Sequence, residues 1–291
     1  GMKRNGETGE NSLEWTSRYG SVVTSAFEIA STDGMNEKGL VANLLWLPET
    51  EYPVRDKNKP GLAITAWVQY MLDNFATVEE AVAYIDEDTF QVVSDMMPDG
   101  SRLATLHLSI SDATGDCAIF EYIGGKLTVY HSKEYKVMTN SPTYNKQLAL
   151  SEYWKSIGGL SFLPGTNRAA DRFARASFYI NALPETDDER IAVASVFSVV
   201  RNASVPYGIS TPESPEISTT QWRTVSESKN LRYFFESSLT PNTFWVNLKD
   251  FDLSEGAPVF KLSIANGEMY HGNTAKNFKT ALPFKFMGVK G

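Results

Sequence analysis

The sequence predicts an α+β fold in which helices cover antiparallel sheets. Apolar and polar residues alternate over 104–111, and turns at Asp112–Gly115 and Gly124-Gly125 separate this run from two further strand-like runs, as in an antiparallel meander. The middle third changes to helical spacing, and strand-like runs return after residue 219. Strands, then helices, then strands along one chain indicate layers of sheet and helix around a shared core.

Local patterns place each predicted element. The pair Thr77 and Glu80 has the spacing of a capping box and marks a helix start. Asp33-Gly34 and Pro98-Asp99-Gly100 have the composition of turns, and an apolar stripe from Ala169 to Leu183 recurs at helical spacing. The predicted strands cover residues 21–30, 40–47, 104–111, 117–122, 127–130, 137–139, 219–226, 231–238, 243–248 and 259–263, and the predicted helices cover residues 62–75, 77 onward, 169–183 and 187–200.

Length and composition describe an ordinary globular chain. The 291 residues are 42% hydrophobic and 21% charged, which is enough to bury a sizeable core, and nothing divides residues 1–291 into more than a single domain. The formal net charge of −8 argues against binding to a nucleic-acid backbone. Because no apolar run reaches about 18 residues, we expect no membrane span.

Motifs of the common catalytic classes are missing from the sequence. His107, His131 and His271 do not have metal-ligand spacing, and there is no HExxH, paired CxxC, P-loop, GxGxxG or GxSxG. We therefore expect no metal and no cofactor. His107 lies on a predicted strand among Thr and Ser, and we interpret it as structural. Cys117, the one cysteine, lies mid-strand, which is typical of an inert buried thiol.

Five short segments, taken in order along the chain, carry a family resemblance. They are Asp33-Gly34-Met35-Asn36-Glu37-Lys38-Gly39-Leu40, Val137-Met138-Thr139-Asn140-Ser141-Pro142, Leu163-Pro164-Gly165 followed by Asp171-Arg172-Phe173, Val205-Pro206-Tyr207-Gly208 and Tyr233-Phe234-Phe235. Together they resemble the choloylglycine hydrolase family, which includes bile salt hydrolases and penicillin V acylases. The resemblance covers essentially the whole chain and implies the four-layer αββα sandwich of the N-terminal-nucleophile hydrolases.

The resemblance also implies a chemistry. In this family an N-terminal Cys thiolate attacks a linear amide, and its own α-amino group acts as the base, since that group titrates near working pH. The resemblance assigns Asn140 to stabilisation of the developing oxyanion and Arg172 to the polar cluster around the nucleophile. Judged by position alone, Asn140 is an ordinary turn residue and Arg172 a solvated helix charge.

Three further residues are candidates for substrate binding. Trp46 stands where the family usually has Asn or Tyr, which resembles the Gram-negative branch. An indole N–H can donate but not accept a hydrogen bond, so we expect Trp46 to form a wall of the acyl pocket, with a core position as the alternative. Met96 and Met97 could line a steroid site, although a Met pair is equally typical of core packing.

The sequence departs from the family at two places. Residues 1–10 resemble an internal family segment, so we expect a chain that is truncated at its N-terminus, has no nucleophile, is inactive and has an unpaired sheet edge. Residues 141–162 are shorter than the segment that forms a tetramer-assembly tongue in Gram-positive relatives. A homo-oligomer, either tetramer or dimer, is still expected.

These points predict an enzyme that hydrolyses a linear C–N amide in a small molecule. We expect a glycine- or taurine-conjugated bile salt as substrate first and penicillin V second. The alternative from another class is a non-enzymatic binding or scaffold member of the family. Resemblance to the Gram-negative branch favours a periplasmic location, with a cytoplasmic one as the alternative.

Overall fold

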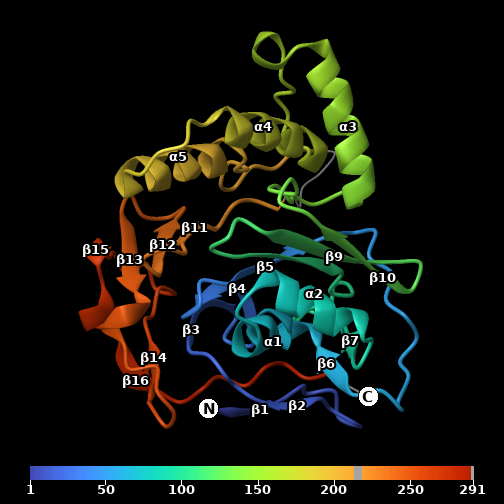
Figure 1. The fold of residues 1–291 in the computed structure, drawn as a ribbon, viewed down its shortest axis with the longest axis vertical. Helices are drawn as coiled ribbons and strands as arrows, with labels where there is room; N and C mark the ends of the chain where they lie inside the picture. The colour runs from blue at the N-terminus through green and yellow to red at the C-terminus, as the bar shows by residue number, and fades with distance from the viewer. Residues whose placement is uncertain (213–217, 290–291) are drawn as a thin grey trace.

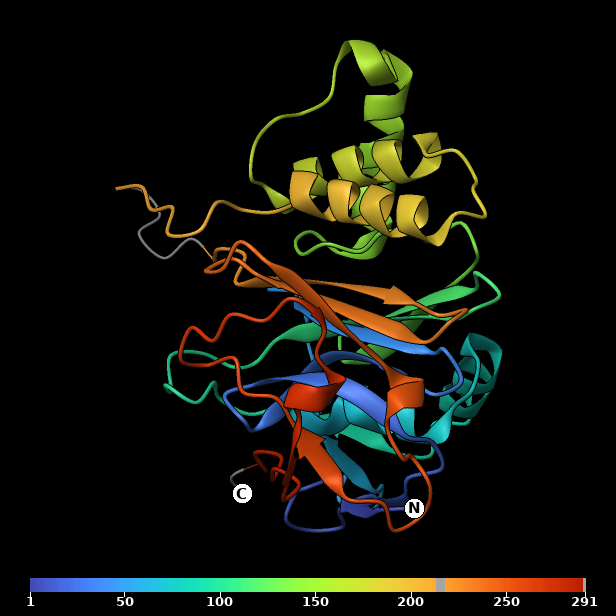
Figure 2. The ribbon, with the colours of Figure 1, turned by 90° about the vertical axis from the view of Figure 1, so that its left-hand side faces the viewer.

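Two β-sheets lie one over the other at the centre of the molecule, and helices cover the outer face of each (Figure 1, Figure 2). The computed structural model describes residues 1–212 and 218–289. Within these residues the larger sheet has six strands in the order β10-β9-β8-β5-β4-β3, and the smaller has four in the order β11-β12-β13-β15. The predicted α+β class and the αββα layering are confirmed.

The elements have the following bounds. The larger sheet contains β3 Ser21–Ala26, β4 Ala30–Asn36, β5 Val41–Trp46, β8 Leu106–Ser111, β9 Cys117–Ile123 and β10 Lys126–His131. The smaller contains β11 Trp222–Glu227, β12 Arg232–Ser237, β13 Thr243–Asn247 and β15 Gly272–Asn273. The helices are α1 Trp67–Asn74, α2 Val78–Asp86, α3 Tyr144–Ile157, α4 Ala169–Ala182 and α5 Glu189–Asn202. Short strand pairs join β1 Lys3–Asn5 to β2 Glu14–Thr16, β6 Gly61–Ala63 to β7 Gln91–Val93, and β14 Val259–Lys261 to β16 Lys279–Ala281.

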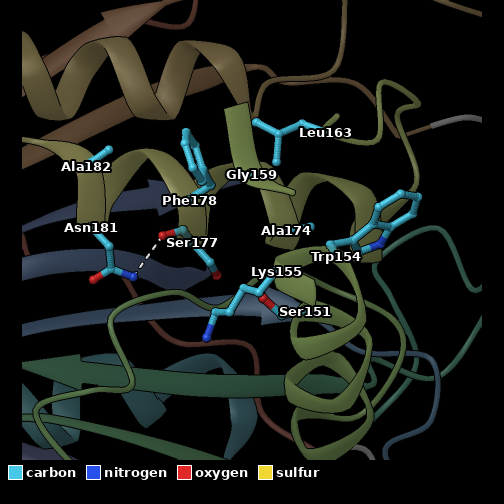
Figure 3. A pocket seen from close by; sticks show the side chains of 10 residues that line it. All are labelled: Ser151, Trp154, Lys155, Gly159, Leu163, Ala174, Ser177, Phe178, Asn181 and Ala182. Carbon is cyan, nitrogen blue, oxygen red and sulfur yellow. Dashed lines mark hydrogen bonds between the residues drawn. The ribbon is translucent and has the colours of Figure 1, made fainter. Parts of the chain in front are cut away.

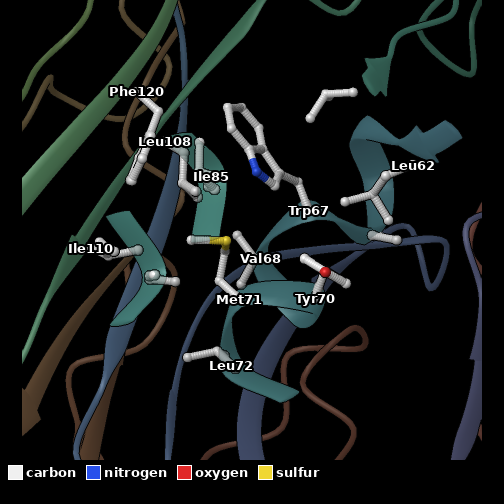
Figure 4. Close-up of a cluster of buried hydrophobic side chains, with 14 of the residues drawn as sticks. Leu62, Trp67, Val68, Tyr70, Met71, Leu72, Ile85, Leu108, Ile110 and Phe120 are labelled. Atoms are coloured by element: carbon white, nitrogen blue, oxygen red, sulfur yellow. The ribbon is translucent and has the colours of Figure 1, made fainter. Parts of the chain in front are cut away.

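The main apolar core lies between the larger sheet and helices α1 and α2. Trp67 and Met71 of α1 pack in one fully buried cluster with Leu108 of β8 and Phe120 of β9 (Figure 4). The rings of Trp67 and Phe120 meet edge to face with their centroids 6.4 Å apart. Burying each such side chain stabilises the fold by about 1.5–3 kcal/mol, so this layer holds the larger sheet firmly on one side.

A buried polar network crosses from the larger sheet to the smaller one. Tyr233 of β12 donates its hydroxyl to Asp33 Oδ1 of β4, and the Trp222 indole of β11 donates to Asp33 Oδ2 at 3.2 Å. The Tyr233 hydroxyl also lies 2.7 Å from Thr24 Oγ1 of β3. Burial raises the pKa of Asp33, and the Tyr233 and Trp222 donors oppose this shift. The network therefore links the two sheets through the Asp33 carboxyl group and through the direct contact of Thr24 with Tyr233.

Helix α5 covers the outer face of the smaller sheet, whereas α4 packs with α3 against Ile119 of β9 in the larger sheet. Phe197 of α5 is buried against Val225 of β11 and Phe234 of β12. Helix α3 packs along α4 and extends away from the sheets at one end of the molecule (Figure 1). None of the helices among the described residues is long and apolar enough to cross a membrane.

Several local predictions are confirmed. The meander forms β8, β9 and β10, and the stripe from Ala169 forms α4. Thr77 is the N-cap of α2 and accepts a hydrogen bond from the Glu80 backbone N–H. Gly100, in the predicted turn after Pro98, has a φ of 71°.

The turn predicted at Asp33-Gly34 is wrong. The chain turns between β3 and β4 at Phe27 and Glu28, which have φ values of 55° and 57°, whereas Asp33 and Gly34 lie inside β4. The glycine is instead explained by close packing, because a Cβ on Gly34 would stand 2.4 Å from the Val22 carbonyl oxygen.

Two other local predictions are corrected, and one helix was missed. Residues 137–139 are not in a strand, and the Thr139 carbonyl accepts a hydrogen bond from the His107 ring. The helix predicted over 62–75 begins only at Trp67, because residues 61–63 pair with β7. Helix α3 was not predicted, since its apolar side chains do not follow one clear stripe.

Candidate active site

Asn140 and Arg172 form a direct hydrogen bond at the end of β5. Arg172 Nη2 donates to Asn140 Oδ1 at 2.7 Å, and Asn140 Nδ2 donates to the Trp46 carbonyl oxygen at 2.7 Å. Arg172 Nε donates in turn to the Asn167 carbonyl oxygen at 3.1 Å. The structure therefore joins two predicted site residues that are 32 positions apart and lie on a loop and in the first turn of α4.

These contacts fix the orientation of the Asn140 amide. Since a guanidinium can only donate, the atom facing Arg172 must be the amide oxygen, and the amide nitrogen must face Trp46. An amide nitrogen carries two hydrogens, and the Trp46 carbonyl accepts one of them. Among the described residues no hydrogen bond uses the second, so it can donate to a developing oxyanion, which is the chemistry that acyl transfer requires.

The arginine is half-buried beside this amide. Burial, with a smaller contribution from the neighbouring charge of Arg175, lowers the pKa of Arg172. A guanidinium titrates so far above neutral pH that Arg172 remains a cation even with this shift. A fixed positive charge thus lies within hydrogen-bond distance of the amide oxygen.

A second contact holds the Asn140 turn against the segment after β5. Ser141, the residue after Asn140, donates a hydrogen bond from its hydroxyl to Glu49 Oε1. Glu49 Oε2 is buried, and it has no hydrogen-bond partner among the described residues. Sequence reasoning did not select Glu49, because an acidic residue after Leu47-Pro48 has no distinguishing pattern.

The three predicted substrate-binding residues have different surroundings. Trp46 contacts Asn140 through its backbone, while its indole N–H donates to Thr105 Oγ1 at 3.1 Å and the Arg102 guanidinium lies 4.2 Å from its ring centroid. Met96 is 43% exposed, and Met97 packs against the main core cluster. The role of both methionines in a substrate pocket therefore stays a prediction.

Cys117 is a poor candidate for the nucleophile. Burial and the nearby carboxylates of Asp116 and Asp112 raise the pKa of its thiol to about 11. A thiol with this pKa is almost entirely protonated at neutral pH, and the thiolate is the reactive form. The described residues also contain no group of three or more His, Cys, Asp or Glu side chains that could hold a metal ion.

A separate apolar cavity of about 300 Å³ lies between α3 and α4 (Figure 3). Neither Asn140 nor Arg172 is among its lining residues, which are Ser151, Trp154, Lys155, Gly159, Leu163, Ala174, Ser177, Phe178, Asn181 and Ala182. This lining contains no carboxylate, histidine or cysteine. Its ionisable side chain, Lys155, is paired with Glu152 Oε1 at 2.5 Å, and the cavity lies apart from Asn140 and Arg172.

Known proteins resemble this chain along most of its length. Residues 2–261 match the family described as linear amide C–N hydrolases, choloylglycine hydrolase family. A penicillin V acylase of Pectobacterium atrosepticum is 50% identical over 310 residues, which cover 99% of this chain and 82% of that protein. A bile salt hydrolase/transferase of Clostridium perfringens is 29% identical over 224 residues, which cover 68% of this chain and 67% of that protein.

Solved structures agree with this relationship. The structure of penicillin V acylase from Agrobacterium tumefaciens has a TM-score of 0.93 at 54% identity and covers 99% of this chain and 89% of that one. A variant of the conjugated bile acid hydrolase from Clostridium perfringens has a TM-score of 0.72 at 22% identity, covers 91% of this chain and 89% of that one, and shows likeness in fold alone. The sequence match and the structural match together establish that this chain belongs to the choloylglycine hydrolase family of linear amide C–N hydrolases.

Proposed function

We propose that this chain forms the acyl-transfer site of an amidase whose preferred substrate is penicillin V. The observation that carries the reaction is the oriented Asn140 amide, which has one N–H left to donate and whose oxygen is held by Arg172. The relatives at 50% and 54% identity are penicillin V acylases, whereas the bile salt hydrolase is 29% identical. We therefore place penicillin V before the conjugated bile salt that the sequence had favoured.

The proposed reaction needs a thiolate that Cys117 does not supply. As the family resemblance implies, we place the nucleophile on an N-terminal Cys outside these 291 residues, and we propose that the 291-residue chain alone does not hydrolyse amides. The thiolate adds to the amide carbon, and the carbonyl oxygen becomes an anion that accepts a hydrogen bond from Asn140. When the C–N bond breaks, the amine leaves with a proton from the α-ammonium group, and water then hydrolyses the thioester.

The test uses the product of the complete reading frame with Asn140→Ala. Because the lost contact is strongest when the oxyanion forms, we expect kcat for penicillin V to fall about 10²–10³-fold while the protein still folds. Asn58→Ala, at an exposed turn residue, is the matched control and should leave kcat unchanged. Unchanged turnover in Asn140→Ala would exclude the proposed role.

Substrate choice is tested on the same complete protein. We expect a higher kcat/KM for penicillin V than for a taurine-conjugated bile salt, and the opposite order would restore the bile salt as the substrate. Binding of either compound without cleavage would favour the non-enzymatic alternative. Cleavage by the 291-residue chain alone would contradict the proposed N-terminal nucleophile.

Two further properties remain proposals. We propose a homo-oligomer, to be checked by light scattering on the purified complete protein. We also propose a periplasmic location, to be checked by fractionating cells that express the complete reading frame.

A further inference from the structure

A fully buried pair of ionisable side chains lies next to the Asn140 turn. His107 of β8 and Glu121 of β9 are both 0% exposed. Leu108 pairs with Phe120 in these antiparallel strands, so the neighbouring residues His107 and Glu121 lie opposite each other. His107 Nδ1 is 2.9 Å from Glu121 Oε1. Such groups are rarely retained in a core unless every polar atom has a partner.

The partners of the pair determine where its protons are. His107 Nε2 lies 2.8 Å from the Thr139 carbonyl oxygen, and since a carbonyl can only accept, Nε2 must carry a hydrogen. Glu121 Oε2 accepts the Tyr144 backbone N–H at 2.9 Å, at the first residue of α3, where the helix dipole favours negative charge. A carboxylate at Glu121 then makes His107 a donor from both ring nitrogens.

The two contacts enclose the turn from both sides. Thr139 immediately precedes Asn140, and Tyr144 follows the Ser141-Pro142 peptide. Gln147, which is 1% exposed, donates to the Pro142 carbonyl at 2.7 Å and accepts from Thr139 Oγ1 at 2.8 Å. The backbone on both sides of Asn140 is thus held by buried side chains from β8, β9 and α3.

We propose that His107 is a positioning residue for the Asn140 amide, acting through its hydrogen bond to the Thr139 carbonyl, and this proposal rests on the proposed function of Asn140. A side-chain amide can be aimed only as accurately as its backbone is held. Helix α4, through Arg172, orients the amide itself, whereas His107 fixes the loop that carries it. Loss of the contact would therefore displace the oxyanion donor without removing it.

Two substitutions separate this role from simple burial. The side-chain nitrogen of His107→Gln lies near the place of Nε2, so it can still donate to Thr139 but not to Glu121. The side-chain nitrogen of His107→Asn lies near the place of Nδ1, so it can donate to Glu121 but not to Thr139. Each variant loses one buried hydrogen bond, so the free energy of unfolding should fall in both.

The first experiment needs no activity and uses the 291-residue chain. Side-chain amide signals of Asn140 are assigned in a ¹⁵N–¹H spectrum from their loss in Asn140→Ala. We expect them to shift in His107→Asn and to stay in place in His107→Gln. Equal shifts in both variants, or no shift in His107→Asn, would overturn the proposal even if the complete protein cleaves neither substrate.

The second experiment covers the case in which a variant does not fold. In the wild-type chain with ¹⁵N-labelled histidine, we expect the His107 Nε2 to be protonated at neutral pH, and an unprotonated Nε2 would refute the geometry. In the complete protein we expect His107→Asn to lower kcat about 10–100-fold relative to His107→Gln, with little change in KM. A change confined to KM would contradict a role in oxyanion positioning.

Discussion

Replacing Tyr233 by Phe removes a single oxygen from the network that joins the two sheets. The lost contacts are the hydrogen bond to the buried carboxyl of Asp33 and the one to Thr24 Oγ1. A hydrogen bond to a charged group contributes about 1.5–3 kcal/mol and a neutral one about 0.5–1.5 kcal/mol. Since the Trp222 donor remains on Asp33, we expect the free energy of unfolding to fall by about 2–4 kcal/mol at a pH where Asp33 is ionised.

The assay is urea unfolding of the 291-residue chain, compared with Tyr122→Phe as a matched control. Tyr122 is as deeply buried as Tyr233, and the hydrogen-bond partner of its hydroxyl within residues 1–212 and 218–289 is the Val92 backbone, so its loss should cost about 1 kcal/mol. A cost for Tyr233→Phe no larger than that of Tyr122→Phe would refute the reasoning.

The pH dependence provides a second check on the same substitution. Burial raises the folded-state pKa of Asp33 above 3.8. The contribution of Asp33 to the free energy of unfolding therefore falls as the pH rises from 3.8 through the folded-state pKa. Tyr233 stabilises mainly the ionised carboxyl. The cost of Tyr233→Phe should therefore shrink as the pH falls and Asp33 gains its proton, and a cost that grows at low pH would contradict this assignment.

Two other predictions concern residues outside the site. Burial raises the pKa of Asp112, but hydrogen bonds from Thr114 and the Val78 backbone lower it more, so its stabilising effect is lost as the pH falls. In urea unfolding, Asp112→Asn should therefore lower the free energy of unfolding by about 1–2 kcal/mol at pH 7 and by less near pH 2. An equal loss at both pH values would contradict the lowered pKa of Asp112. The pKa of Cys117 is about 11, so little of its thiol is ionised at pH 8. We therefore expect iodoacetamide to alkylate Cys117 about two orders of magnitude more slowly in the folded chain than in the urea-unfolded chain. Mass spectrometry measures both rates, and equal rates would contradict the raised pKa.

The parts of the fold that could be predicted are those whose conformation depends on residues close together in the sequence. The meander and α4 follow from residue spacing, and the start of α2 from the Thr77 capping box. The Asp33-Gly34 turn was mispredicted because the dipeptide has turn composition, whereas its conformation is set by distant contacts. Tyr233 and Trp222, far along the chain, bind Asp33, and the Val22 carbonyl leaves no space for a side chain on Gly34.

The candidate site also depends on contacts between residues far apart in the sequence, which local patterns do not predict. Neither Asn140 nor Arg172 is unusual for its position, and only the family resemblance paired them before their hydrogen bond was seen. His107 was interpreted as structural from its strand position among Thr and Ser, and its partners, Glu121 and the Thr139 carbonyl, are 14 and 32 residues away. A side chain's neighbours across a sheet cannot be read from its own strand, so the connection of His107 to the Asn140 turn required the structure.

The contact between Asn140 and Arg172 has a consequence for which side chains can occupy position 140. A rotated amide would set its NH₂ group against the guanidinium, donor against donor, so only one of the two amide orientations is tolerated. If Asn140 has the proposed role, a substrate carbonyl that gains negative charge meets a dipole already turned toward it, with no reorientation left to perform. An aspartate here would match the amide in size and still pair with Arg172, but it would present lone pairs to the anion. The proposed role therefore requires a side chain at position 140 that donates a hydrogen bond, and a side chain of the same shape that can only accept does not meet this requirement.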